Sequence, residues 1–348
     1  MMIPRERVRA ALAFRPVDAV PLLVHPSPGG LFEHGQKLLD LMRACGHDFD
    51  DLSSVRLPEV PAADFDPDGR YHRIAADEWG TTWEYRIFGI WGHRIGYPLA
   101  DLSRLETWRP PPIVRLAGEE LSRARAAGEA HRRTYFHLAA NVSLFETMQS
   151  LRPFDDVLVD IAQDAPGINR LADLLMEYHS VMIDNALAAG ADAIAVFDDY
   201  GTQQAPMMSP KAWRRFFAPR YRALFGPVVK AGKGVFFHSC GCVGPLLEDF
   251  RGVGATAVWP QLPLFDLREL ARRCRALGLA VQMQPDRGEL MQRRGPREVR
   301  DHVRRLADAF ETLSGGSWLH IEIDPGFPWE NVRALFETAM ELRRRGII

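Results

Sequence analysis

The sequence predicts a single α/β domain over residues 1–348, a (β/α)₈ barrel with an aromatic-rich insertion after its second strand. Short apolar runs alternate with amphipathic helical segments, which is typical of a parallel sheet with helical crossovers. Eight such runs are present, the number that closes a barrel of this kind. A doubly wound open sheet is the alternative. No glycine-rich dinucleotide or phosphate-binding fingerprint follows the first run, which disfavours that alternative.

The expected elements follow from these patterns in chain order. Residues 4–14 carry apolar positions at helical spacing and end before Pro16. Ser209 and Pro210 form a helix start signal. The expected strands are 20–24, 48–55, 135–140, 193–197, 235–237, 256–259, 279–283 and 318–323. The expected helices between and after them are 31–45, 117–128, 143–188 with breaks, 209–230, 243–252, 266–277, 296–313 and 330–345.

Residues 56–130 interrupt the alternation and are rich in proline and aromatic residues. Within them, residues 78–85 and 89–97 have the composition of a β-hairpin. We expect this insertion to cover one mouth of the barrel. Its tryptophans have two interpretations: they pack into a small aromatic core, or Trp79, Trp83 or Trp91 lines a substrate cavity.

Composition excludes several classes of protein. The formal net charge is −2, so no global field favours nucleic acid or an anionic membrane. The sequence has neither an apolar run long enough to cross a bilayer nor an apolar signal peptide, and we expect a cytoplasmic protein. Four cysteines in 348 residues do not make a disulfide framework. Two of them, Cys240 and Cys242, lie close together, which favours metal or redox chemistry there.

Residues 234–244 carry the most specific chemical signal. An apolar run, 235–237, ends in His238, Cys240 and Cys242. In an extended chain residues two apart point the same way, so His238 and Cys240 can bind one ion. Zinc suits a mixed nitrogen and sulfur set with a third protein ligand and one open position. The third ligand is Cys242 or a residue of the last strand. The alternative is a small apolar filling role for the cysteines and a core histidine.

Polar side chains follow most of the other strands. Asp198 and Asp199 come directly after an apolar run, and the alternation of a strand points one of them inward and the other away. The inward carboxylate then serves as a proton donor or orients a substrate; the alternative for both is capping of a helix or loop. The remaining polar residues at strand ends are Asn141, Gln261, Gln284, Asp286, His320, Glu322 and Asp324.

With these residues identified, the chain resembles the uroporphyrinogen decarboxylase superfamily over nearly its whole length. That resemblance implies a (β/α)₈ barrel. The motifs that carry it are residues 15–21, 197–204 (Phe-Asp-Asp-Tyr-Gly-Thr-Gln-Gln), 208–210, 237–241 (Phe-His-Ser-Cys-Gly), 254, 259–261, 315–316 and 328–332.

The two large branches of that superfamily differ in the residues they would need here. One decarboxylates the acetate side chains of a tetrapyrrole without a metal, using an arginine-rich loop after the first strand. Residues 25–30 (His-Pro-Ser-Pro-Gly-Gly) contain no arginine. The other branch transfers methyl groups between a corrinoid protein and a thiol or a methoxylated or methylated compound. Enzymes of this branch look like zinc proteins whose ligands are a His-x-Cys on strand 5 and a cysteine near strand 8. His238 and Cys240 match the first two ligands, but this chain has no cysteine on strand 8.

The resemblance therefore favours zinc-assisted methyl transfer, with a corrinoid on a separate partner protein and a small-molecule substrate. His238, Cys240 and either Cys242 or Glu322 would hold the zinc, and Asp198 or Asp199 would position or protonate the substrate. The expected catalytic residues are Asp198, Asp199 and Glu322. Two alternatives stand beside it: a metal-free decarboxylase of a tetrapyrrole or other carboxylated ring compound, and a binding protein without turnover. The resemblance also implies a homodimer. The residues expected to contact the substrate are Asn141, Gln203, Gln261, Asp286 and His320.

Overall fold

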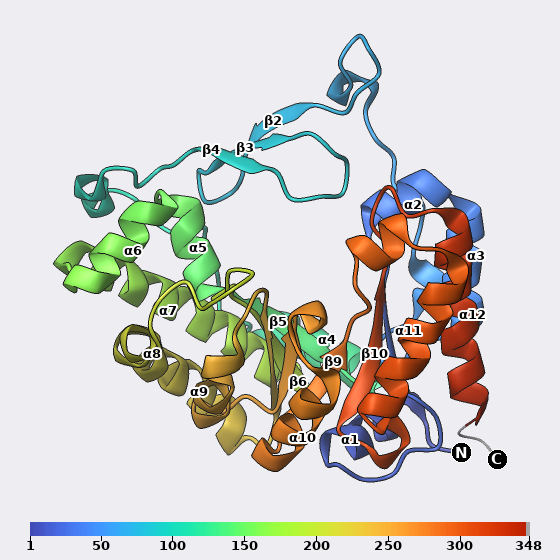
Figure 1. Cartoon of the computed structure of the whole chain (residues 1–348). Coiled ribbons are helices and arrows are strands. Elements are labelled where there is room, and N and C mark those ends of the chain that lie inside the picture. Colours follow the sequence, from blue (N-terminus) through green and yellow to red (C-terminus); the bar gives the residue numbers. More distant parts are fainter. Residues whose placement is uncertain (346–348) are drawn as a thin grey trace.

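A seven-stranded parallel sheet forms the centre of the protein, whose computed structural model describes residues 1–345. The strand order is β1-β10-β9-β8-β7-β6-β5, and the sheet curls so that it forms most of a barrel (Figure 1). Seven of the eight predicted strands are therefore confirmed. Their bounds are β1 Leu22–His25, β5 Leu138–Val142, β6 Ala193–Phe197, β7 Gly234–Ser239, β8 Ala257–Pro260, β9 Ala280–Met283 and β10 Ser317–Glu322.

Helices cover the outside of this sheet (Figure 1). Ser209 caps α8 as predicted, because its side chain accepts a hydrogen bond from the backbone of Ala212. No helix within residues 1–345 is long and apolar enough to span a bilayer. The helices are α1 Pro4–Leu12, α2 Pro28–His34, α3 Gln36–Cys45, α4 Gly118–Arg132, α5 Leu144–Leu151, α6 Phe154–Gln163, α7 Pro166–Ala188, α8 Pro210–Lys230, α9 Leu247–Gly252, α10 Leu267–Leu277, α11 Pro296–Ala309 and α12 Trp329–Arg345.

The predicted second strand, 48–55, is wrong. The chain passes between β1 and β5 there but makes only one backbone hydrogen bond to each side, from Asp48 to Leu22 and from Phe136 to Asp48. Side chains replace the missing backbone acceptors. The Asp48 carboxylate accepts the amide of Leu22 at 2.7 Å, and Nδ1 of His47 accepts that of Val24 at 3.3 Å. The backbone N–H groups along this edge of β1 thus have hydrogen-bond acceptors without a strand beside them.

Asp48 joins this bridging segment to both ends of the chain. Its side chain is fully buried and pairs with Arg7 of α1 at 2.5 Å and with Arg343 of α12 at 2.6 Å. A buried carboxylate needs such partners because its desolvation is costly. The ion-pair network holds the first and last helices against the gap in the sheet.

Aromatic residues fill the half of the barrel interior that lies at the amino ends of the strands. Phe236 of β7 faces inward and contacts the ring of Trp318 of β10, with 4.9 Å between ring centres. Val8 of α1 belongs to the same apolar cluster, so α1 closes this end. The barrel interior is therefore packed at the amino ends of the strands, and polar side chains can meet only at the carboxyl ends.

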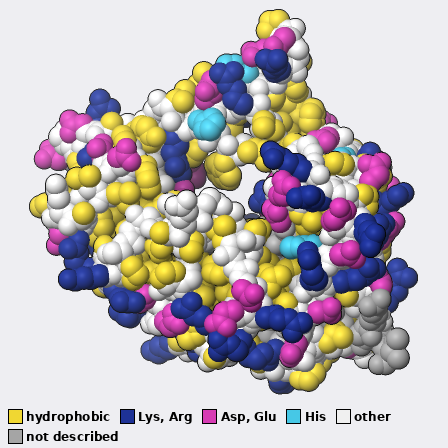
Figure 2. Space-filling model, viewed as in Figure 1, with side chains coloured by type: hydrophobic (Ala, Val, Ile, Leu, Met, Phe, Trp, Pro, Cys, Tyr) yellow, Lys and Arg dark blue, Asp and Glu magenta, His cyan; other side chains and the backbone are white. Residues whose placement is uncertain are grey.

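A three-stranded antiparallel sheet, which we call the cap, lies across the carboxyl ends of the barrel strands (Figure 1). It consists of β2 Arg73–Ala76, β3 Thr82–Tyr85 and β4 His93–Gly96, of which β3 and β4 form the predicted hairpin. One end is tied to α5, where Arg94 pairs with Glu146 at 2.6 Å. The other end meets α2 through Phe88 and Phe32, 5.3 Å apart. Figure 2 shows an opening between the cap and the barrel.

Two of the three tryptophans of the insertion have the first of the two predicted roles, packing into an aromatic core. Trp79 packs against Tyr178 of α7 at 4.8 Å, and Trp83 is buried, so both hold the cap together. Trp91 contacts Trp83 but leaves 81% of its surface exposed.

Candidate active site at the mouth of the barrel

The carboxyl end of β7 lies in the middle of the sheet, paired with β6 and β8. In register, His238 lies between Phe197 of β6 and Trp259 of β8. Phe237 points outward and stacks on Phe250 of α9, with 4.3 Å between ring centres. Because side chains alternate along a strand, this anchors His238 on the inner face.

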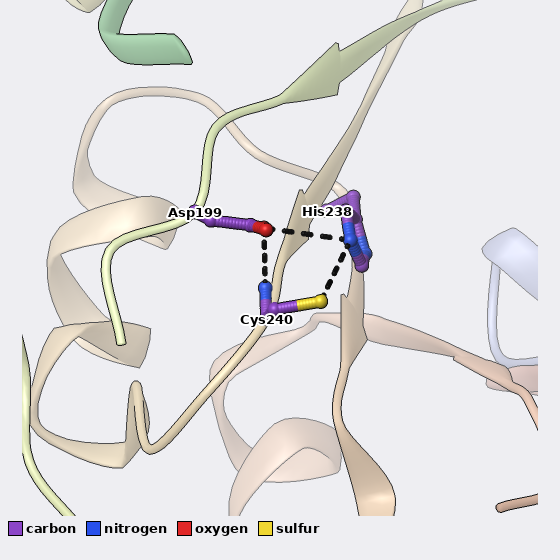
Figure 3. A group of neighbouring side chains, drawn as sticks. All are labelled: Asp199, His238 and Cys240. Atoms are coloured by element: carbon purple, nitrogen blue, oxygen red, sulfur yellow. Dashed lines mark hydrogen bonds and ion pairs between the residues drawn. The ribbon is translucent and has the colours of Figure 1, made fainter. Parts of the chain in front are cut away.

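Three potential metal ligands converge at this strand end: Asp199, His238 and Cys240 (Figure 3). Nε2 of His238 lies 3.4 Å from Sγ of Cys240 and 3.5 Å from Oδ1 of Asp199. The same carboxylate oxygen accepts the backbone N–H of Cys240 at 2.6 Å. Gly241 follows with φ +82°, and a Cβ at this position would collide with the backbone of Gly201, so no larger residue would fit.

The orientation of the His238 ring is fixed by its second nitrogen. Nδ1 lies 2.9 Å from the backbone oxygen of Trp259, which can only accept, so Nδ1 carries the proton. Nε2 is left with a lone pair directed at Asp199 and Cys240. Burial lowers the pKa of His238 and keeps the ring in the neutral form that binds metals. Burial and the Asp199 carboxylate raise the pKa of Cys240 to about 12, so its thiol stays protonated at neutral pH unless a cation is bound.

The two donor distances measured from Nε2 of His238 fit a tetrahedral ion. Zinc bonds of about 2.0–2.3 Å at tetrahedral angles place neighbouring donors roughly 3.3–3.7 Å apart. The distances of 3.4 and 3.5 Å from Nε2 of His238 lie in that range. Within the described part of the chain, this is the one group of three such residues whose ligand atoms lie within 4.8 Å of one another.

The adjacent acids Asp198 and Asp199 have different surroundings. Asp199 faces the mouth, whereas Asp198 is fully buried behind the sheet. The Asp198 carboxylate accepts the backbone amides of Leu144 and Glu146 at the start of α5 and the hydroxyl of Tyr221. Burial raises its pKa to about 7, against the effect of these three donors. Asp198 therefore caps α5, the structural alternative that the sequence left open for both acids.

Comparison with known proteins shows to which family this chain belongs. The family model described as uroporphyrinogen decarboxylase (URO-D) matches residues 103–342. The chain belongs to the URO-D family. A solved methyltransferase from Methanosarcina mazei is similar over 98% of this chain and 99% of its own, at 17% identity and a TM-score of 0.68. At that identity the similarity establishes the fold.

Other matches are weaker. A dihydropteroate synthase from Anaplasma phagocytophilum covers 60% of this chain and 76% of its own, at 13% identity and a TM-score of 0.38. That score is too low to support a conclusion. No curated protein matches this chain.

In this URO-D chain, the two residues expected to complete the ligand set lie outside the group of three. Cys242 lies farther along the loop and is not part of that group, and its backbone amide donates to the backbone oxygen of Thr202. Glu322 lies at the end of β10 and is bound by Gln284 at 3.0 Å and by Arg287 at 3.0 Å. Asp199, predicted as a catalytic acid, is the third member of the group.

The predicted substrate residues are dispersed around the mouth. Asn141 is exposed at the end of β5. Gln261 pairs with Gln203 and accepts the backbone amide of Gly241 at 3.0 Å, so it supports the turn after Cys240. Asp286 accepts the amides of Gly288 and Leu290 and so caps its own loop.

His320 lies one layer deeper in the barrel than Glu322. It is buried, accepts a hydrogen bond from Gln282 at 3.0 Å and packs edge-on against Trp259 at 4.6 Å between ring centres. Desolvation lowers its pKa well below the usual value, so the ring is neutral.

Three charged residues of the mouth were missed by sequence reasoning: Arg94, Glu146 and Arg287. Arg287 binds Asp324 through two hydrogen bonds of 2.6 Å each. It follows Asp286 directly, so the rule that active-site groups follow barrel strands could have found it. Burial and the Asp199 carboxylate raise the pKa of Glu146, so Glu146 lies near the group of three. No local signal in the insertion marks Arg94 as its partner.

Proposed function

We propose that this protein is a zinc-assisted methyltransferase that takes a methyl group from a small methoxylated or methylated compound. The acceptor would be a thiol or a corrinoid carried by a separate partner protein. Family membership and the similarity in fold to a methyltransferase support the reaction class. The observation that carries the proposal is the convergence of Asp199, His238 and Cys240 at the barrel mouth.

These residues would hold zinc through the carboxylate, Nε2 and Sγ, leaving a fourth position for the reacting group. Bound zinc would supply the positive charge that lowers the pKa of a thiol or hydroxyl placed there. The protein's own part is orientation. The backbone oxygen of Trp259 directs Nε2 of His238 into the site, and Asp199 holds the backbone of Cys240. Such outer contacts fix ligand geometry.

The metal-free decarboxylase is less well supported by this site. A carboxylated ring compound would need free guanidinium groups, but Arg94 and Arg287 are already paired with carboxylates. The loop after β1 has no arginine. A homodimer and a cytoplasmic location remain predictions.

Metal analysis tests the proposal. The purified protein should carry about one zinc per chain, and His238→Ala and Cys240→Ser should each lose it. Cys242→Ser is the matched control, since that cysteine lies outside the group of three. Folding of each variant is checked by circular dichroism. Folded wild-type protein that takes up no zinc, even when zinc is supplied, would exclude the proposal.

A further inference from the structure

Carboxylates outnumber guanidiniums among the charged groups that surround the candidate zinc site. The carboxylates are Glu146, Asp199, Glu322 and Asp324, and the guanidiniums are Arg94 and Arg287. Each guanidinium is already paired within this set, Arg94 with Glu146 and Arg287 with both Glu322 and Asp324. The ionised set therefore carries two negative charges in excess.

Zinc would not remove this excess. A divalent ion bound together with the Cys240 thiolate adds one positive charge, so one negative charge would remain. Asp199 would be bound to the metal. The carboxylates that remain on the other side of the site are Glu322 and Asp324, which we call the acidic wall. Glu322 is connected to the metal site through Gln284 and Trp259, whose ring lies 4.0 Å from that of His238. An anionic substrate would meet repulsion here and no unpaired guanidinium from this set.

Two aromatic rings border the same space. Phe197 and Trp259 meet nearly at right angles, 83°, with 6.2 Å between ring centres, and both are partly exposed. Trp259 also lies against His238 at 4.0 Å. Its indole N–H donates to Gln284, which in turn donates to Glu322. This chain places the aromatic corner beside the acidic wall. Ring faces next to a carboxylate are suited to a cation that carries methyl groups.

We propose that the methyl donor is a methylated cation, an ammonium or sulfonium compound, held between Glu322 and the rings of Phe197 and Trp259. This inference rests on the proposed methyl transfer and names its substrate class. The chemistry agrees with the site. When the acceptor is a thiol, the sulfur of its thiolate, rather than that of Cys240, forms a bond to the methyl carbon, the carbon–nitrogen or carbon–sulfur bond breaks, and its electron pair stays on the departing atom. The product leaves as a neutral amine or thioether, so no acid is required to protonate it.

Calorimetric titration of the zinc-loaded protein with three probes of one shape tests this. Choline carries the positive charge, 3,3-dimethylbutan-1-ol replaces the nitrogen by carbon, and 3,3-dimethylbutanoate is an anion. Choline should bind about tenfold more tightly than the alcohol, and the anion more weakly than either. Equal binding of choline and the alcohol, or preference for the anion, would overturn the inference.

Variants locate the preference. Glu322→Gln and Phe197→Leu should each reduce the ratio of choline to alcohol affinity severalfold, and Glu330→Gln, an exposed acid on α12, should leave it unchanged. Phe197→Leu retains every charge, so it remains informative if Glu322→Gln fails to fold. If zinc binds but the probes are not distinguished, this inference fails and the proposed function stands. If choline is preferred by a protein that never binds zinc, the proposed function fails and the cation site stands.

Discussion

The backbone oxygen of Trp259 lies 2.9 Å from Nδ1 of His238 and decides which nitrogen of the imidazole faces Cys240. This contact joins β7 to β8, whose pairing places the two residues side by side. The tautomer of the candidate ligand is thus set by the register of the sheet rather than by a mobile side chain. A ligand fixed in this way loses little conformational freedom when a metal binds.

Asp199→Asn should weaken zinc binding by at least about tenfold, the lower end of what loss of even an outer-shell partner costs. The amide is neutral and a poorer zinc ligand than the carboxylate, although its oxygen can still accept the amide of Cys240. Competition against a zinc-binding dye measures the affinity. Unchanged affinity in a folded variant would return the third-ligand role to Glu322 or Cys242.

Asp198→Asn should instead destabilise the fold by about 1–3 kcal/mol and leave zinc content unchanged. The new amide group would place a donor among the three donors that now bind the Asp198 carboxylate. Urea unfolding measures the loss, with the exposed Asp155→Asn as control. A variant of normal stability that loses zinc would show that Asp198, rather than its neighbour, serves the metal.

The contrast between these neighbours shows what the sequence could predict. Strand alternation correctly separated an inward from a buried acid, because it depends only on local geometry. It could not say that the buried one caps α5, since Leu144 lies more than fifty residues earlier in the chain.

The prediction of a second strand over residues 48–55 failed for a related reason. Its neighbours are satisfied by the side chains of His47 and Asp48, and residue types alone do not reveal that exchange.

Asp48→Asn should reduce the free energy of unfolding by about 3–5 kcal/mol, because it breaks an ion-pair network at its fully buried carboxylate. Arg7 would keep its pair with Asp18, whereas Arg343 would lose its charged partner. Arg343 would keep only its hydrogen bond to the backbone of Val20 among its described contacts other than Asp48. Urea unfolding measures the change, again against Asp155→Asn. A loss below about 1 kcal/mol would show that the network contributes little beyond what exposed ion pairs do.

Stability should fall as the pH drops from about 6.5 to about 4, in part through His179. Its ring is buried in α7, donates to the backbone oxygen of Ser143 at 3.1 Å, and burial lowers its pKa to about 4. Between that value and the ordinary pKa of about 6.5 the unfolded chain binds a proton that the folded protein does not, so acid favours unfolding. From pH 7.5 to pH 5 this single group should remove about 2 kcal/mol.

His179→Gln keeps an N–H donor for Ser143 but cannot titrate, so it should lose this part of the pH dependence, measured as urea midpoints at several pH values. His93→Gln, at an exposed position of the cap, should keep it.

The comparison between variants is needed because Asp198 changes the pH dependence of stability in the opposite direction. Its pKa is raised to about 7, so between about 4 and 7 the folded protein holds the extra proton and stability from that group falls as pH rises. A wild-type curve alone sums both effects, whereas the difference between His179→Gln and wild type isolates the histidine. Parallel curves for the two proteins would mean that the pKa of His179 does not differ between the folded and the unfolded protein.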